Sequence, residues 1–317
     1  MKKSIILLLV VSLLSLTVFA AYPVKTVEIV CPWGAGGGTD RLARFFADQL
    51  QKGLGEPFVV VNKTGGGGAV GHSAGAFARP DGYTVTLVTL EISLMHWMGL
   101  TTLNVDNFDY VIQLNQDASS VLVKADAPWQ TVEELLEEIR KNPGKIKFSG
   151  SSAGSIWDLA RIGMFNAVGI APDAVIWVPT TGAAPSIVEL LGGHVEVITC
   201  SLPEASAQVE AGQLRALAVM ANQRLPQYPN VPTLKEQGIN WSAGTWRGLS
   251  VPKNTPKEVI QTLYDASLKI AQSDAFKEFM SKTGFGIELR GPEEFYKFAK
   301  EQDTTWQAIL KLGGYTK

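Results

Sequence analysis

The chain has 317 residues, 46% of them hydrophobic, and a formal net charge of −2. A chain of this size can bury a large core and form one large or two ordinary domains. The nearly balanced charge and the lack of a basic run argue against nucleic acid as a partner. The three histidines and two cysteines lie far apart without metal-ligand spacing, so we expect no metal site and no cofactor.

The N-terminus has the pattern of a secretory signal peptide. Two lysines precede an apolar run over residues 5–16, and small residues follow at Ala20 and Ala21. This run is too short for a comfortable membrane span, and no cysteine comes directly after Ala21. We therefore expect residues 1–21 to be a signal peptide. The remainder is expected in the periplasm or another extracytoplasmic space, without stable membrane insertion.

Export permits a disulfide but does not require one. Cys31 and Cys200 each end an apolar segment typical of a strand. Cysteine is commonly buried as a small apolar side chain in such places. We therefore expect two free, buried thiols.

A glycine-rich stretch from Cys31 to Asp40, with the sequence CPWGAGGGTD, follows an expected strand over residues 27–31. A helix is expected to open at Thr39. The small side chains let a ligand approach the backbone, and the unpaired N–H groups at a helix start favour an anion. A tight turn whose glycines serve only positive φ angles explains the stretch equally well. By itself the stretch leaves both interpretations open.

The first hundred residues alternate strand and helix, which predicts a parallel sheet covered on both faces. A second glycine-rich turn spans residues 63–71, and a later strand over residues 83–89 leads to Glu91. Ligands in such sheets bind beyond the carboxyl ends of the strands, so both glycine turns and Glu91 are expected to face one crevice. The glycine spacing does not match a dinucleotide fingerprint, because no ribose-binding acid follows a clean second strand.

Residues 125–245 repeat the alternation and predict a second α/β unit. A helix begins at Thr131, with Glu134 completing a capping box. A strand over residues 145–148 then runs into a loop rich in hydroxyl groups, residues 149–155. These hydroxyls suit a carboxylate ligand, although serines also serve simply as helix caps and turn formers.

The C-terminal part is too short for a third domain and is expected to pack back on the first unit. Its expected elements are a strand over residues 248–251 and helices over 256–272, 274–283 and 292–312. Two further strands, over residues 110–113 and 120–124, are expected just before the second unit. The expected fold is thus two doubly wound α/β domains joined by a hinge that the chain crosses twice. The first domain is residues 22–121 plus 248–317, and the second is residues 122–247.

Short motifs occur in order along the chain after residue 21. They include Pro32-Trp33-x-Ala35-Gly36-Gly37-x-Thr39-Asp40, Val60-Val61-Asn62-Lys63-x-Gly65, Arg79-Pro80-Asp81-Gly82-Tyr83, Asn142-Pro143-Gly144-Lys145, Gly192-Gly193-His194-Val195 and Val231-Pro232-Thr233-Leu234. Each motif is modest, but together they cover essentially the whole mature chain. In combination they resemble the Bug family, the substrate-binding proteins of tripartite tricarboxylate transporters.

The resemblance implies a two-domain periplasmic binding protein of type II that has no catalytic activity. Such a protein binds a small mono-, di- or tricarboxylate, or an amino acid, between its domains and delivers it to the membrane subunits of a transporter. Backbone groups and bridging water hold the ligand. We expect a monomer. The implied ligand-binding residues, to which we add Glu91 from its strand end, are Trp33, Gly34, Ala35, Gly36, Gly37, Thr39, Asp40, Ser149, Ser151, Ser152, Ala153, Ser155, Thr180, Thr181 and Ala183.

Three positions depart from the family pattern. Trp33 replaces a more usual Phe or Tyr and offers a larger stacking wall. Thr181 stands where the family often has Lys or Arg, which weakens the case for a multiply charged ligand such as citrate. Glu91 lies where neutral polar residues are common. It either accepts an ammonium group of the ligand or is a solvated loop acid.

Two alternative functions are an exported hydrolase and a ligand-presenting sensor. An exported hydrolase with a serine nucleophile needs a base beside that serine. The three histidines are poorly placed for this role, and no Gly-x-Ser-x-Gly motif is present. A sensor that presents its ligand to a membrane kinase would keep the same fold and site and differ only in its partner.

Overall fold

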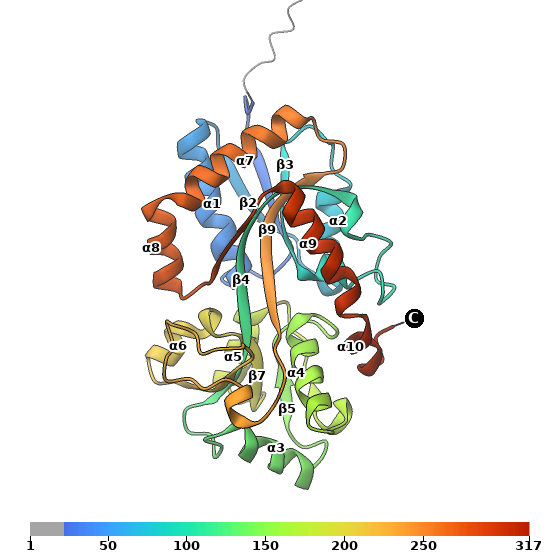
Figure 1. Ribbon diagram of the computed structural model, residues 1–317, viewed down its shortest axis with the longest axis vertical. Coiled ribbons are helices and arrows are strands. Elements are labelled where there is room, and N and C mark those ends of the chain that lie inside the picture. The colour runs from blue at the N-terminus through green and yellow to red at the C-terminus, as the bar shows by residue number, and fades with distance from the viewer. Residues whose placement is uncertain (1–21, 317) are drawn as a thin grey trace, which may run out of the picture.

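The computed structural model describes residues 22–316, so the expected signal peptide lies outside the described residues. Two lobes are stacked along the long axis of the molecule, and the long strands β4 and β9 run through both (Figure 1). The strands are β1 (Val27–Cys31), β2 (Phe58–Asn62), β3 (Thr84–Thr89), β4 (Phe108–Lys124), β5 (Lys147–Ser149), β6 (Ile176–Trp177), β7 (Val197–Ser201), β8 (Leu214–Val219), β9 (Gly244–Pro252) and β10 (Ile287–Arg290). The helices are α1 (Gly38–Leu54), α2 (Ala69–Ala76), α3 (Val132–Lys141), α4 (Ile156–Ala167), α5 (Ala183–Leu191), α6 (Ser206–Glu210), α7 (Lys257–Gln272), α8 (Asp274–Thr283), α9 (Pro292–Thr305) and α10 (Gln307–Leu312).

The sheet of the first lobe is mixed, with the strand order β2-β1-β3-β9-β4. Strand β1 runs parallel to β2 and β3, whereas β9 runs antiparallel to both β3 and β4. The strands of the first hundred residues are parallel, as expected, but the sheet that they form with β9 and β4 is mixed. The reason is the topology, since β9 returns from the second lobe and enters the sheet in the opposite direction.

Strand β4 is one continuous strand of 17 residues, not the two short strands expected from the sequence. It pairs with β9 as far as Ala118 and with β7 and β8 from Ser119 onward. Gln113, Asn115 and Asp117 interrupt its apolar pattern, yet all three are buried. Because strands are recognised in a sequence by their apolar residues, these polar residues made β4 look like two short strands. Strand β9 likewise begins at Gly244, four residues before the expected start.

The second lobe repeats the alternation of strand and helix as expected. Strands β5, β6 and β7 are mutually parallel, and β7 and β8 pair with the far half of β4. The domain boundaries expected at residues 121/122 and 247/248 fall inside β4 and β9, the two connecting strands. Those boundaries remain a prediction.

The C-terminal segment makes a further link between the lobes that the sequence did not predict. The helix expected over residues 292–312 is interrupted at Trp306, and α10 then packs against α4 of the second lobe. The hydroxyl of Tyr315 donates to the buried carboxylate of Asp158, at 2.5 Å. The rings of Trp306 and Trp241 meet edge to face, with centroids 6.1 Å apart.

Both cysteines are free and buried, as expected. Burial raises the pKa of Cys31 to about 12, so its thiol stays protonated at neutral pH. Between residues 22 and 316, no helix has both the length and the apolar character needed to cross a bilayer.

Candidate functional site

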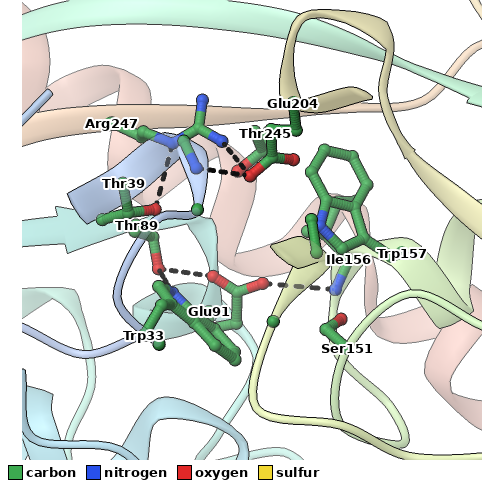
Figure 2. A pocket seen from close by; sticks show the side chains of 15 residues that line it. Trp33, Thr39, Thr89, Glu91, Ser151, Ile156, Trp157, Glu204, Thr245 and Arg247 are labelled. Atoms are coloured by element: carbon green, nitrogen blue, oxygen red, sulfur yellow. Dashed lines mark hydrogen bonds and ion pairs between the residues drawn. The ribbon is translucent and has the colours of Figure 1, made fainter. Parts of the chain in front are cut away.

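A small cavity lies between the two lobes (Figure 2). Its volume is about 30 Å³, which is room for about two water molecules. Loops that follow β1 and β3 form one wall, and loops from the second lobe form the other. The lining residues are Trp33, Gly34, Gly37, Gly38, Thr39, Thr89, Glu91, Ser151, Ile156, Trp157, Gly182, Ala183, Glu204, Thr245 and Arg247.

The first glycine-rich loop is braced from behind by Asp40. The Asp40 carboxylate accepts hydrogen bonds from the Gly36 N–H, from Nε of Arg44 and from Nδ2 of Asn62, each at 2.9 Å. Burial would raise the pKa of Asp40, but these hydrogen bonds together hold it below its ordinary value. Asp40 is therefore an ionised brace of the loop, and it does not line the cavity.

The second glycine-rich turn lies behind the cavity wall rather than at the cavity. Gly71 packs so closely on the first loop that a Cβ there would lie 2.5 Å from Cα of Pro32. A Cβ on Gly68 would lie 3.3 Å from the Trp33 ring and from His72. The expectation that both turns face the crevice is therefore wrong. The glycines of this turn allow close packing that supports Trp33, whose Nε1 donates to Oγ1 of Thr89 at 3.1 Å.

Glu91 follows β3 and points into the cleft, and it is only 2% exposed. One carboxylate oxygen accepts from the Thr89 hydroxyl at 2.5 Å, and the other accepts from the N–H of Ile156 at 3.2 Å. Ile156 is the first residue of α4 in the opposite lobe. Burial raises the pKa of Glu91, and these hydrogen bonds only partly oppose the rise. The interpretation of Glu91 as a solvated loop acid is thus wrong.

Arg247 lies at the centre of the cleft because of the strand register. It pairs with Thr89 on β3 and with Asn115 on β4. Its Nη1 donates to Oδ1 of Asn115 at 2.6 Å and to Oδ2 of Asp117 at 2.7 Å, and its Nε donates to Oγ1 of Thr39 at 3.1 Å. The guanidinium is 3% exposed. Burial raises the pKa of Asp117, and the charge of Arg247 works against that rise.

Glu204 reaches across from the second lobe, just after β7. Its Oε1 accepts from the N–H of Gly38, the first residue of α1, at 2.9 Å and lies 3.4 Å from Nη2 of Arg247. Its Oε2 accepts from the Ser201 hydroxyl at 3.1 Å. Thus each lobe places one of its own carboxylates at the N-terminus of a helix that belongs to the other lobe.

The hydroxyl-rich loop uses most of its hydroxyls on its own neighbours. Ser149 donates to the carbonyl of Val178 at 2.7 Å, and Ser155 donates to the carbonyl of Ser152 at 2.6 Å. Ser151 is hydrogen-bonded to Ser155, and it is the member of the loop that lines the cavity.

The loop before α5, residues 180–182, also forms hydrogen bonds with the segments around it. Thr180 bonds the Ser186 hydroxyl at 2.6 Å, and its carbonyl accepts from Ser152 at 3.3 Å. The carbonyl of Thr181 accepts from the N–H of Gly34 at 3.1 Å, which joins the two lobes through the backbone.

The structure brings together seven of the residues expected at the site and leaves nine outside the cavity lining. Those that line it are Trp33, Gly34, Gly37, Thr39, Glu91, Ser151 and Ala183. Those that do not line it are Ala35, Gly36, Asp40, Ser149, Ser152, Ala153, Ser155, Thr180 and Thr181.

Eight lining residues are not among those named from the sequence, namely Gly38, Thr89, Ile156, Trp157, Gly182, Glu204, Thr245 and Arg247. Glu204 could have been found, because it follows the carboxyl end of β7 just as Glu91 follows β3. Arg247 was missed because the expected strand began only at residue 248, whereas β9 begins at Gly244.

Within residues 22–316, no three His, Cys, Asp or Glu side chains gather in a way that could hold a metal ion. His72, which is hydrogen-bonded to the lining residue Thr89, has both ring nitrogens engaged. Its Nε2 accepts from the N–H of Thr89 at 3.2 Å, and its Nδ1 lies 2.8 Å from the carbonyl of Gly68. Burial lowers the pKa of His72 to about 4, so the ring is neutral at pH 7.

The model of the tripartite tricarboxylate transporter family receptor matches residues 42–314 of this chain. A UPF0065 protein of Cupriavidus necator is 30% identical over 299 residues, which cover 93% of this chain and 90% of the relative. Protein BugT of Bordetella pertussis is 28% identical over 306 residues, covering 92% of this chain and 90% of BugT.

Solved structures of periplasmic binding proteins share the fold over nearly the whole chain. The periplasmic binding protein BugD is 29% identical, with a TM-score of 0.87, covering 93% of this chain and 100% of BugD. The R. palustris protein Rpa4515, solved with adipate, is 26% identical, with a TM-score of 0.86 and coverages of 92% and 98%. A TctC solute-binding protein from Polaromonas, solved without ligand, is 36% identical, with a TM-score of 0.67 and coverages of 92% and 99%.

Proposed function

Because this chain belongs to the tripartite tricarboxylate transporter receptor family, we propose that it is a periplasmic receptor that binds a small carboxylate between its two lobes and delivers it to the membrane subunits of a transporter. The observation that carries the proposal is the cavity between the lobes. The N-terminal turns of α1, α4 and α5 and the guanidinium of Arg247 converge on it. Helix N-termini and a guanidinium are the groups that bind carboxylates best in proteins. The adipate bound to the relative Rpa4515 is a ligand of this class.

The charges at the cleft restrict which carboxylate fits. Arg247 supplies one positive charge, against the carboxyl groups of Asp117 and Glu91 even if Glu204 leaves the cleft. A ligand with several negative charges would be repelled by these acids in a region of low dielectric constant. We infer a ligand with one carboxylate near Arg247 and a hydrogen-bond donor, such as an ammonium or amide group, near Glu91. An amino acid satisfies both conditions.

The same geometry supports binding rather than catalysis. A serine nucleophile needs a base within hydrogen-bonding reach. The hydroxyl of Ser151 is bonded to Ser155, and His72 is committed to Gly68 and Thr89. We therefore propose that the protein carries its ligand unchanged. The proposed receptor acts as a monomer.

Calorimetric titration against mono-, di-, tri- and aminocarboxylates tests the proposal. The protein should first be unfolded and refolded to remove any ligand retained through purification. Glu91→Gln should weaken the binding of aminocarboxylates by about tenfold, the value of one charged hydrogen bond, and should not weaken that of simple carboxylates. The matched control is Glu133→Gln, an exposed acid on α3. Equal affinity of wild type and Glu91→Gln for every ligand would refute the role of Glu91, and failure of all carboxylates to bind would refute the proposed function.

A further inference from the structure

The cavity is too small for the ligand while the side chains around it stay where they are. Its volume of about 30 Å³ compares with about 300–1,000 Å³ for ordinary ligand pockets. Room must come from opening of the lobes, from side chains that leave the cleft, or from both. Glu91 and Glu204 are the two lining acids whose hydrogen bonds bridge the lobes.

Glu204 occupies the position that an anionic ligand would take. The Gly38 N–H, the Ser201 hydroxyl and the Arg247 guanidinium all point at its carboxylate (Figure 2 shows the last of these). The fit around Gly38 is close, because a Cβ at this residue would lie 2.8 Å from both Oε1 of Glu204 and Nη2 of Arg247. A backbone N–H at a helix start, a hydroxyl and a guanidinium together form an anion site.

Among the contacts of Arg247 with Glu204, Asn115 and Asp117, the contact with Glu204 is the longest. The guanidinium lies 3.4 Å from Glu204, against 2.6 Å from Asn115 and 2.7 Å from Asp117. Arg247 would thus remain hydrogen-bonded and charge-paired if Glu204 moved away. Glu204 also lies in a single 3₁₀ turn, Leu202–Ala205, which needs less rearrangement than a long helix.

We propose that Glu204 is a built-in competitor of the ligand, which holds the two lobes together by occupying the anion site until a carboxylate ligand replaces it. The inference rests on the proposed function, since it concerns the same cleft. The ligand carboxylate would take over the Gly38 N–H and the contact with Arg247, while Glu204 turns toward solvent. A closed form held by Glu204 reduces the apparent affinity for the ligand, because part of the binding free energy is used to displace the Glu204 carboxylate.

Glu204→Gln and Glu204→Ala test this competition by two independent measurements. The first is titration with succinate and with L-glutamate, followed through tryptophan fluorescence, because Trp33 and Trp157 line the cavity. Removal of one charge-assisted competitor should lower the Kd of a probe that binds by about tenfold. The matched control is Glu210→Gln, an exposed acid at the end of α6 in the same segment.

The second measurement is small-angle X-ray scattering of the refolded protein in buffer without carboxylates. Glu204→Ala should have a larger radius of gyration than wild type and Glu210→Gln, since a link between the lobes is lost. A weaker affinity in Glu204→Gln would mean that Glu204 is itself a ligand contact and would overturn the inference. An unchanged affinity together with unchanged scattering would also overturn it. If wild type and all variants bind neither probe, the scattering result decides the inference, and the titration against the full range of carboxylates decides the proposed function.

Discussion

His72 should make the stability of this protein depend steeply on pH between 6.5 and 4. The ring is fully buried, and burial lowers its pKa from 6.5 to about 4. Because Nε2 accepts the Thr89 N–H, the single ring proton lies on Nδ1 and is donated to the carbonyl of Gly68. A second proton on Nε2 would oppose the N–H of Thr89, which leaves two donors facing each other.

The sign and the size of the effect follow from this pKa. Between pH 6.5 and pH 4 the unfolded chain binds a proton at His72 that the folded protein does not bind, so folding is disfavoured as the pH falls. The stabilisation is fully present above pH 6.5 and is lost as the pH falls toward 4. A decrease in pKa from 6.5 to about 4 corresponds to about 3 kcal/mol of unfolding free energy.

Urea unfolding of wild type and His72→Gln across this pH range measures the effect. Carboxylates titrate in both proteins, so their contribution cancels in the difference between the two curves. The advantage of wild type over His72→Gln should shrink by about 3 kcal/mol from pH 7 to pH 4. His194→Gln, which replaces an exposed ring, should follow the wild-type curve. Parallel curves for wild type and His72→Gln would refute the argument.

Two further predictions concern glycine substitutions, with Gly71 at the first loop and Gly53 as the comparison, and the reactivity of the two buried thiols. Gly71→Ala should destabilise the protein by about 2 kcal/mol or more and weaken ligand binding, since its Cβ would lie 2.5 Å from Cα of Pro32. Gly53→Ala, in a helical position with nothing within 4 Å, should instead stabilise by about 0.5–1 kcal/mol, as urea denaturation would report. Cys31 and Cys200 should resist a thiol reagent in the native protein and react after unfolding, and rapid native labelling of either would contradict their burial.

The alternation of apolar segments predicted the two-lobe α/β fold, but it could not predict the length of the connecting strands. Periodicity identifies a strand by its apolar face, and β4 carries buried polar residues between two apolar halves. These residues are buried because they face Arg247 and Arg290 from β9 and β10. Their partners are more than 100 residues distant in sequence, so only the tertiary structure reveals why polar side chains occupy a central strand.

Part of the site can be recognised from a local sequence motif, and part of it cannot. The first glycine loop is recognisable because its function depends on small residues in a row, and Trp33, Gly34 and Gly37 indeed line the cavity. Arg247 and Glu204 belong to no motif. Strand register brings Arg247 beside Thr89 and Asn115, and the closeness of the lobes brings Glu204 to Gly38.

This division indicates where ligand selectivity resides. Backbone N–H groups at helix starts bind any carboxylate, since they present the same partial charge whatever the ligand carries elsewhere. The side chains that discriminate are those with charge, and three of them, Glu91, Glu204 and Arg247, come from three different strand ends or strands. A substitution at any one of them changes the charge of the cleft and leaves the sequence of the glycine loop unchanged. The proposed ligand of this chain should therefore match the excess of acids around Arg247.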